Sequence, residues 1–108
     1  MLIDADLPSV TQKHEVNCKV NYASVQQLQF LNKLSMKTVY EFASSRPDYV
    51  QPKIDAVTFE SREAKLIDLY FPPQMKYGTA EVYIFANDLE YNLVECYLLR
   101  ITYLPWFL

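Results

Sequence analysis

The chain has 108 residues, of which 51% are hydrophobic, and this length and composition suit a single domain around one core. Its 10 Lys and Arg against 13 Asp and Glu give a net charge of -3 that is spread along the sequence, which argues against a nucleic-acid partner. Gly78 is the only glycine and His14 the only histidine, so a glycine-rich phosphate loop is excluded and histidine chemistry has little to draw on.

The N-terminal residues predict an extended arm over residues 1–12, because Pro8 disfavours regular structure there. Asp4 and Asp6 stand where a secretory signal carries basic residues, which predicts a cytoplasmic location. The apolar C-terminal stretch 98–108 is much shorter than the ~20 residues that a bilayer span needs. We therefore expect one domain over residues 1–108 without membrane association.

The first regular element is a predicted strand from His14 to Tyr22, in which apolar and polar residues alternate. A helix is predicted next, from Val25 to Ala43. Ser24 and Gln27 have the spacing of a capping box, and one face of the helix would be apolar. Pro47 would end this helix, because the residue before a proline avoids the α region.

Four further strands are predicted after the helix, and their ranges are Val57–Glu60, Lys65–Phe71, Thr79–Ala86 and Tyr91–Tyr103. Helical spacing is also present between residues 56 and 71, and the last run is apolar on both alternating faces, as in a buried helix. We favour strands in both places. The fold class expected is α+β, with one helix packed on a curved antiparallel sheet in the order β-α-β-β-β-β.

This order resembles the architecture of cystatin and monellin-like folds, as an analogy of fold alone. The inhibitory parts of cystatins are missing from the sequence. No glycine precedes Gly78, the hairpin after the helix reads Glu60–Glu63, and the Pro-Trp pair at Pro105 lies at the chain end. The resemblance therefore implies no inhibitory mechanism.

Catalytic, cofactor and metal sites are not predicted. His14 suits a solvated strand position better than a catalytic one, and no cluster of soft ligands surrounds Cys18 or Cys96. Both cysteines are expected to be free and buried, because a meander would place the first and last strands at opposite sheet edges. Glu81 and Glu95 could form a carboxylate pair if a three-residue loop joins the last two strands, whereas a two-residue loop would place Glu81 beside Val94.

The doubly apolar last strand points to an interface, since one helix covers one sheet face only. We favour the three-residue loop, which exposes an aromatic face away from the helix. The predicted interface residues are Tyr83, Phe85, Tyr97, Leu99 and, in the C-terminal tail, Trp106. Alternatively, the tail itself covers this face.

The predicted function is a non-enzymatic protein-protein interaction module, acting as a homodimer, adaptor, small subunit or inhibitor of another protein, without cofactors. The alternative is a small-ligand-binding protein or enzyme whose pocket lies between the helix and the concave sheet face. Asn32 and Ser35 could line such a pocket.

Overall fold

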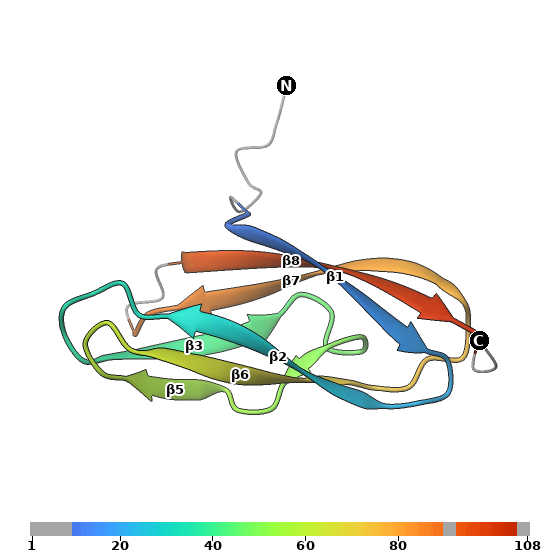
Figure 1. Cartoon of the computed structure of the whole chain (residues 1–108), viewed down its shortest axis with the longest axis horizontal. Coiled ribbons are helices and arrows are strands. Elements are labelled where there is room, and N and C mark those ends of the chain that lie inside the picture. The colour runs from blue at the N-terminus through green and yellow to red at the C-terminus, as the bar shows by residue number, and fades with distance from the viewer. Residues whose placement is uncertain (1–9, 90–92, 106–108) are drawn as a thin grey trace, which may run out of the picture.

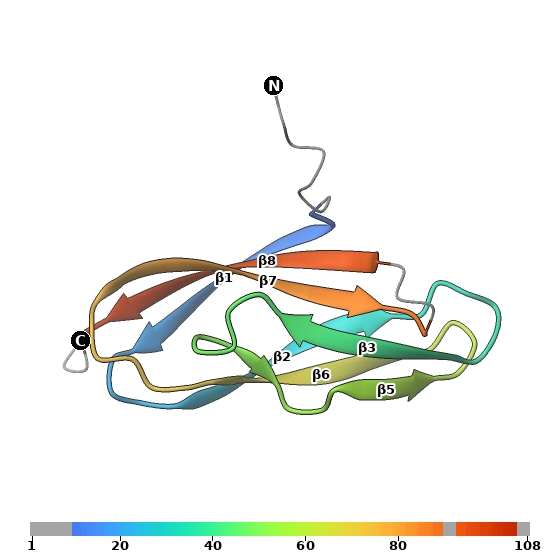
Figure 2. The ribbon, with the colours of Figure 1, turned by 180° about the vertical axis from the view of Figure 1, so that it is seen from behind.

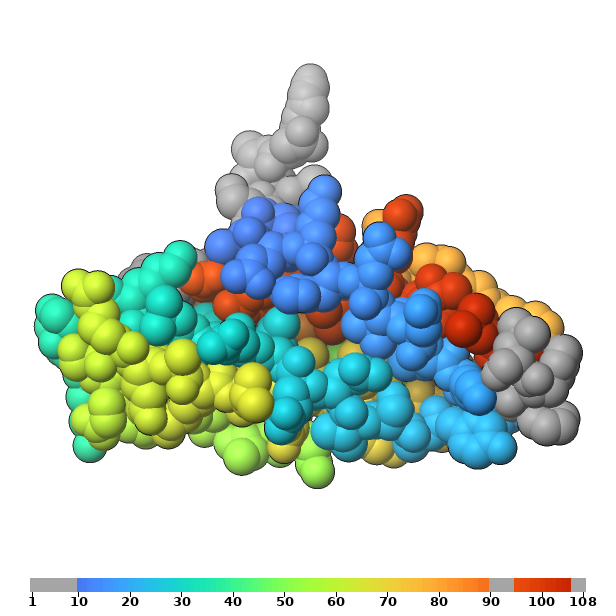
Figure 3. Space-filling view, in the orientation of Figure 1, coloured from blue at the N-terminus to red at the C-terminus, as the bar shows by residue number. Residues whose placement is uncertain are grey.

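The computed structural model describes residues 10–89 and 93–105, and this part of the chain forms eight β-strands and no helix. The strands build two sheets that face each other as a sandwich (Figures 1 and 2). Side chains of β1, β2 and β6 form the face seen in Figure 3. The α+β prediction is therefore wrong, and the fold is an all-β sandwich.

The larger sheet has five strands in the order β1-β8-β7-β3-β5, and the smaller has three in the order β2-β6-β4. β1 runs parallel to β8, while all other neighbours are antiparallel. The strands of the larger sheet are β1 (Gln12–Lys19), β8 (Leu93–Leu104), β7 (Gly78–Asn87), β3 (Thr38–Ser44) and β5 (Ala56–Phe59). Those of the smaller sheet are β2 (Ser24–Leu31), β6 (Ala64–Phe71) and β4 (Gln51–Pro52).

The segment predicted as a helix, from Val25 to Ala43, instead forms β2, a chain reversal and β3. Leu28 and Phe30 are buried at a spacing of two residues, and Tyr40 and Phe42 repeat this pattern in β3. Packing against a second sheet selects this period over the helical one, which Leu28 and Phe42 also fit and Phe30 does not. Ser24 begins a strand and caps no helix.

The reversal between β2 and β3 is organised by Asn32, whose side chain is fully buried. Its Nδ2 donates to the carbonyl oxygens of Met36 and Glu60, both at 3.0 Å. Its Oδ1 accepts hydrogen bonds from the Leu34 amide at 3.0 Å and from the Tyr40 hydroxyl at 2.7 Å. Asn32 is thus saturated within the protein, and it lines no pocket between a helix and a sheet.

The core lies between the two sheets and is centred on Phe30 from the smaller sheet. Its ring centroid lies 4.8 Å from that of Tyr40, 5.2 Å from that of Phe42 and 5.3 Å from that of Phe59. Such tilted and edge-to-face contacts add to the stabilisation that burial of the rings provides. Aromatic rings from both sheets therefore build this part of the core.

The register of β7 and β8 is not the one that we favoured from the sequence, in which Tyr97 and Leu99 share the outer face with Tyr83 and Phe85. Val82 lies opposite Leu99 and Ile84 opposite Tyr97, with an irregularity at Ala86 and Asn87. Tyr97 and Leu99 consequently point into the sandwich and are buried. The five predicted strands are confirmed at or near their expected ranges, but the face assignment of the last strand was wrong, because a second sheet and not a helix covers its inner side.

Cys18 and Cys96 are free and buried, as predicted. The expectation that the first and last strands keep the two cysteines apart at opposite sheet edges was wrong, since β1 and β8 are neighbours in one sheet. The two cysteines stay apart because Cys18 lies opposite Tyr103, whereas Cys96 lies towards the other end of β8.

Candidate interaction site

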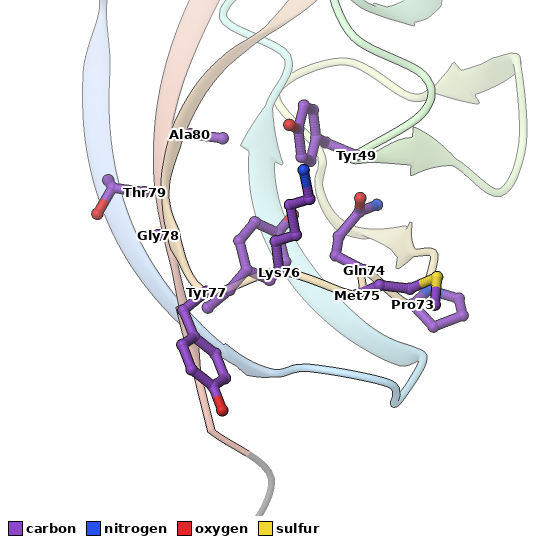
Figure 4. A pocket seen from close by; sticks show the side chains of 10 residues that line it. Tyr49, Pro73, Gln74, Met75, Lys76, Tyr77, Gly78, Thr79 and Ala80 are labelled. Atoms are coloured by element: carbon purple, nitrogen blue, oxygen red, sulfur yellow. The ribbon is translucent and has the colours of Figure 1, made fainter.

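A hollow of 510 Å³ lies beside the loop between β6 and β7 (Figure 4). We call it the loop hollow. It is lined by Tyr49, by Tyr103 and by residues 73–80, which comprise part of the loop and the start of β7. The rings of Tyr49 and Tyr103 are in contact, with centroids 5.9 Å apart. Two aromatic rings, a loop and the first residues of β7 therefore line this site.

The loop is shaped by prolines at its start and a glycine at its end. Pro72 and Pro73 stop β6, and Gly78 has a φ of 138°, which only glycine adopts without strain. Gln74 anchors the middle: its carbonyl accepts from the Asn21 amide at 2.7 Å, and its Nε2 donates to the Asp48 carbonyl at 2.7 Å. The chain beyond Gln74 therefore projects from a fixed base.

The projecting residues are exposed. Met75 is 86% exposed and Tyr77 is 62% exposed, while Lys76 reaches over the hollow towards Tyr49 (Figure 4). A second hollow of 410 Å³, lined by Val20 and Asn21, lies on the other side of the same three residues. Residues 75–77 thus stand as a ridge between two hollows, and we call them the ridge.

The charge at the loop hollow is positive. Arg46 lies over the Tyr49 ring, 4.7 Å from its centroid, and its Nη2 lies 2.7 Å from the Asp48 carboxylate. Hydrogen bonding to Arg46 lowers the pKa of Asp48, and the same bond raises the pKa of Arg46. These two charges compensate each other, and Lys76 is the one charged residue among those that line the hollow.

Tyr103 carries a buried hydroxyl that has no hydrogen-bond partner among the described residues. Its side chain is 5% exposed, and burial raises its pKa. An unpaired buried hydroxyl is costly, and native proteins hold few of them. Tyr103 thus lines the loop hollow, while its hydroxyl is enclosed in the protein and is not used by the described residues.

The outer face of the five-stranded sheet holds two of the predicted interface residues. Tyr83 and Phe85 are half-buried there and stack, with centroids 6.2 Å apart and planes 16° apart. Tyr97 and Leu99 lie in the core instead, and Trp106 is outside the described residues. The structure therefore brings together two of the five predicted residues.

The residues considered for catalysis are dispersed. Glu81 lies opposite Arg100 on the outer face, 3.6 Å from its Nε, and Glu95 forms a 3.2 Å ion pair with Lys33, so the two carboxylates are not paired. His14 Nε2 lies 3.0 Å from Gln12 Oε1. No group of three or more His, Cys, Asp or Glu suited to a metal occurs among residues 10–89 and 93–105.

The sequence-based interpretation missed the ridge. A signal was present, since Met75 and Tyr77 flank Lys76 in a loop bounded by prolines and a glycine. Large apolar residues in an exposed loop add nothing to the core, so their position beside a lysine indicates a contact surface.

In the described ranges, no helix is long and apolar enough to cross a bilayer.

The sequence of residues 11–104 matches the family model described as NPH4 Ig-like domain 4. No curated protein matches. Among solved structures, the sandwich is similar to WR4, an MSP family member of C. elegans, with a TM-score of 0.60 at 6% identity, covering 83% of this chain and 92% of that one.

Two other structures show the same fold. The ASH/PapD-like domain 7 of human CEP192 has a TM-score of 0.61 at 10% identity, covering 90% of this chain and 83% of that one. The CupB2 chaperone of Pseudomonas aeruginosa has a TM-score of 0.58 at 8% identity, covering 87% of this chain and 54% of that one. The fold is therefore an Ig-like β-sandwich of the MSP and PapD-like kind.

Proposed function

The chain belongs to the NPH4 Ig-like domain 4 family, and from this premise we propose that it is a non-enzymatic protein-interaction domain whose loop hollow receives an acidic segment of a partner protein. Ig-like and PapD-like domains are a common kind of protein-interaction module. The loop hollow is the contact site that we assign within this domain, and the segment that it receives is acidic.

The positive charge of Lys76, which reaches over the loop hollow, is the observation that carries this proposal. A bound segment that offers an oxygen acceptor can accept a charge-assisted hydrogen bond from the Lys76 ammonium group. Lys76 favours a carboxylate as that acceptor, since the Arg46–Asp48 pair is already compensated. Met75 and Tyr77 supply exposed apolar surface for the neighbouring residues of the segment.

The test is site-specific photo-cross-linking in the cells that produce the full-length protein naturally. A p-benzoylphenylalanine placed at Met75 should form a covalent adduct with a partner protein. The matched control carries the same probe at Leu66, which is 58% exposed on the outer face of the smaller sheet. The change Lys76→Glu in the Met75 probe chain should abolish the adduct, because it reverses the charge at the hollow.

Equal adducts at Met75 and Leu66, or an adduct at Met75 that survives Lys76→Glu, would contradict the proposal. The cross-linked peptide of the partner also provides a direct readout, since it should contain Asp or Glu. A peptide without either residue would equally contradict it.

A second candidate surface is the stacked pair of Tyr83 and Phe85, on which an adaptor or a subunit could dock. Stacked aromatic side chains that remain half-exposed are frequent in interface centres. The double change Tyr83→Ser with Phe85→Ser should leave the fold intact and remove the partner. If the partner is retained by the folded double variant, this face is not the interface.

A further inference from the structure

β2 is the least protected edge strand of the sandwich. The sheets have four edges, and three of them are protected against pairing with another strand. The edge strand β1 is protected by the charges of Lys13 and Lys19, and β4 by its length of two residues and by Pro52. On β5, the Thr58 carbonyl is occupied, because it accepts a hydrogen bond from Lys65 Nζ at 2.7 Å. β2 has the sequence Ser-Val-Gln-Gln-Leu-Gln-Phe-Leu, eight residues without a charge or a proline.

The pairing with β6 determines which backbone groups of β2 face outwards. The Asn32 amide donates to the Glu63 carbonyl at 2.9 Å, which continues the ladder between these strands. Because antiparallel residues point alternately towards and away from the neighbouring strand, the even-numbered residues of β2 bond to β6. The amides and carbonyls of Val25, Gln27, Gln29 and Leu31 therefore point to the free edge, and no bond to another segment of the described chain occupies them.

β1 runs past this edge in the other sheet and forms no ladder with β2. The two strands diverge from the turn that joins them (Figure 1), and a hollow of 160 Å³ separates His14 to Val16 from Gln26 to Leu28. Figure 3 shows both strands on the same face of the molecule. The edge is therefore open towards its Leu31 end, where β1 has moved away from β2 (Figure 1).

The four residues at the free edge form a palindrome: an apolar side chain, two glutamines and an apolar side chain. All four side chains are exposed. If a second β2 lies antiparallel with its centre at Leu28, Val25 is opposite Leu31 of the partner subunit and Gln27 is opposite Gln29 of the partner subunit. Apolar residues then face each other, and no like charges meet. Gln27 Nε2 donates to Asp68 Oδ1 at 3.0 Å, so Gln27 Oε1 is the atom that can accept from Gln29 of the partner subunit.

This register also satisfies the backbone. Odd-numbered residues oppose odd-numbered residues, and these are the ones whose amides and carbonyls point to the free edge. We propose that two copies of this chain pair through β2 in this register, joining their three-stranded sheets into one continuous sheet. The proposal is independent of the proposed function, because the loop hollow and the ridge are formed by other elements.

The test combines sedimentation velocity with cysteine cross-linking of the full chain. The parent should show a dimer that dissociates on dilution. Gln29→Pro should abolish it, because it removes an outward amide and leaves the ladder to β6 intact. Gln29→Thr, which keeps that amide, is the matched control and should still dimerise.

Cross-linking tests the register. Opposed residues of an antiparallel pair lie about 5.5 Å apart at Cα, within the range of a disulfide, whereas residues two positions out of register do not. A mixture of Gln27→Cys and Gln29→Cys chains should therefore form a disulfide-linked dimer, and neither variant should do so alone. A parent that stays monomeric at every concentration, or a dimer that Gln29→Pro leaves unchanged, would overturn the proposal, and so would a dimer that fails to cross-link in this pattern.

Discussion

Two buried tyrosines show how strongly a single hydroxyl depends on its partner. The Tyr40 hydroxyl donates to Asn32 Oδ1 at 2.7 Å, and the Tyr103 hydroxyl has no partner among the described residues. Both rings are buried. The same substitution should therefore change stability in opposite directions at the two sites.

Tyr103→Phe should increase the free energy of unfolding by about 1 kcal/mol, because it removes a buried polar group that makes no hydrogen bond. Urea denaturation of the purified chain measures this change. A decrease in the free energy of unfolding would show that the hydroxyl has a partner in the free protein.

Tyr40→Phe should decrease the free energy of unfolding by about 1–2 kcal/mol, since Asn32 loses one of its partners inside the core. The same urea experiment serves as the measurement, and Tyr103→Phe is its control for the loss of a hydroxyl as such. Equal values for Tyr40→Phe and the parent would show that Asn32 does not depend on this bond to hold the β2–β3 reversal.

At the scale of elements, successive side chains of β8 point alternately to the inner and the outer side of its sheet. Tyr97 lies opposite Ile84 on the inner side, and Leu98 lies opposite Tyr83 on the outer side. Tyr97→Ser should cost about 3–5 kcal/mol, as expected for the loss of a large buried ring. Tyr83→Ser should cost less than about 1 kcal/mol, because its ring is half-exposed.

Thermal unfolding followed by circular dichroism compares these two variants directly. A larger loss for Tyr83→Ser than for Tyr97→Ser would reverse the assignment of inner and outer faces. It would also require the register in which Tyr97 shares the outer face with Phe85.

At the scale of the whole molecule, burial acts in one direction on several ionisable groups. It raises the pKa values of Tyr40, Tyr97, Tyr103, Cys18 and Cys96. A raised pKa in the folded state means that folding favours the protonated form. The resulting stability is fully present below the pKa of the unfolded chain and is lost as the pH rises above it.

The free energy of unfolding should therefore decline above about pH 8.5–10, the range in which cysteine and tyrosine ionise in an unfolded chain. Urea denaturation at increasing pH measures this decline, and tyrosinate absorbance shows whether the tyrosines ionise later in the folded protein than in the unfolded one. Stability that rises with pH in this range would contradict the prediction.

Alternation along the chain was sufficient to predict five strands, from β1 and from β5 to β8, because a strand with one buried face leaves a period of two residues in its own sequence. The burial of Cys18 and Cys96 was likewise predictable, since it depends on residue type and local pattern. The mistake at Val25 to Ala43 had a physical cause. Leu28, Val39 and Phe42 fit a helical stripe as well as two strands, and local spacing does not distinguish them.

Only the tertiary structure decided between one helix and two strands. β2 lies in the smaller sheet and β3 in the larger one, so the inner face of each strand packs against the opposite sheet. The same applies to the site. Tyr49, Gln74 and Tyr103 are far apart in sequence and form one hollow only after β6, β7 and β8 have packed. The hydrophobic pattern of a chain determines which residues are buried, whereas long-range strand pairing determines which of them meet.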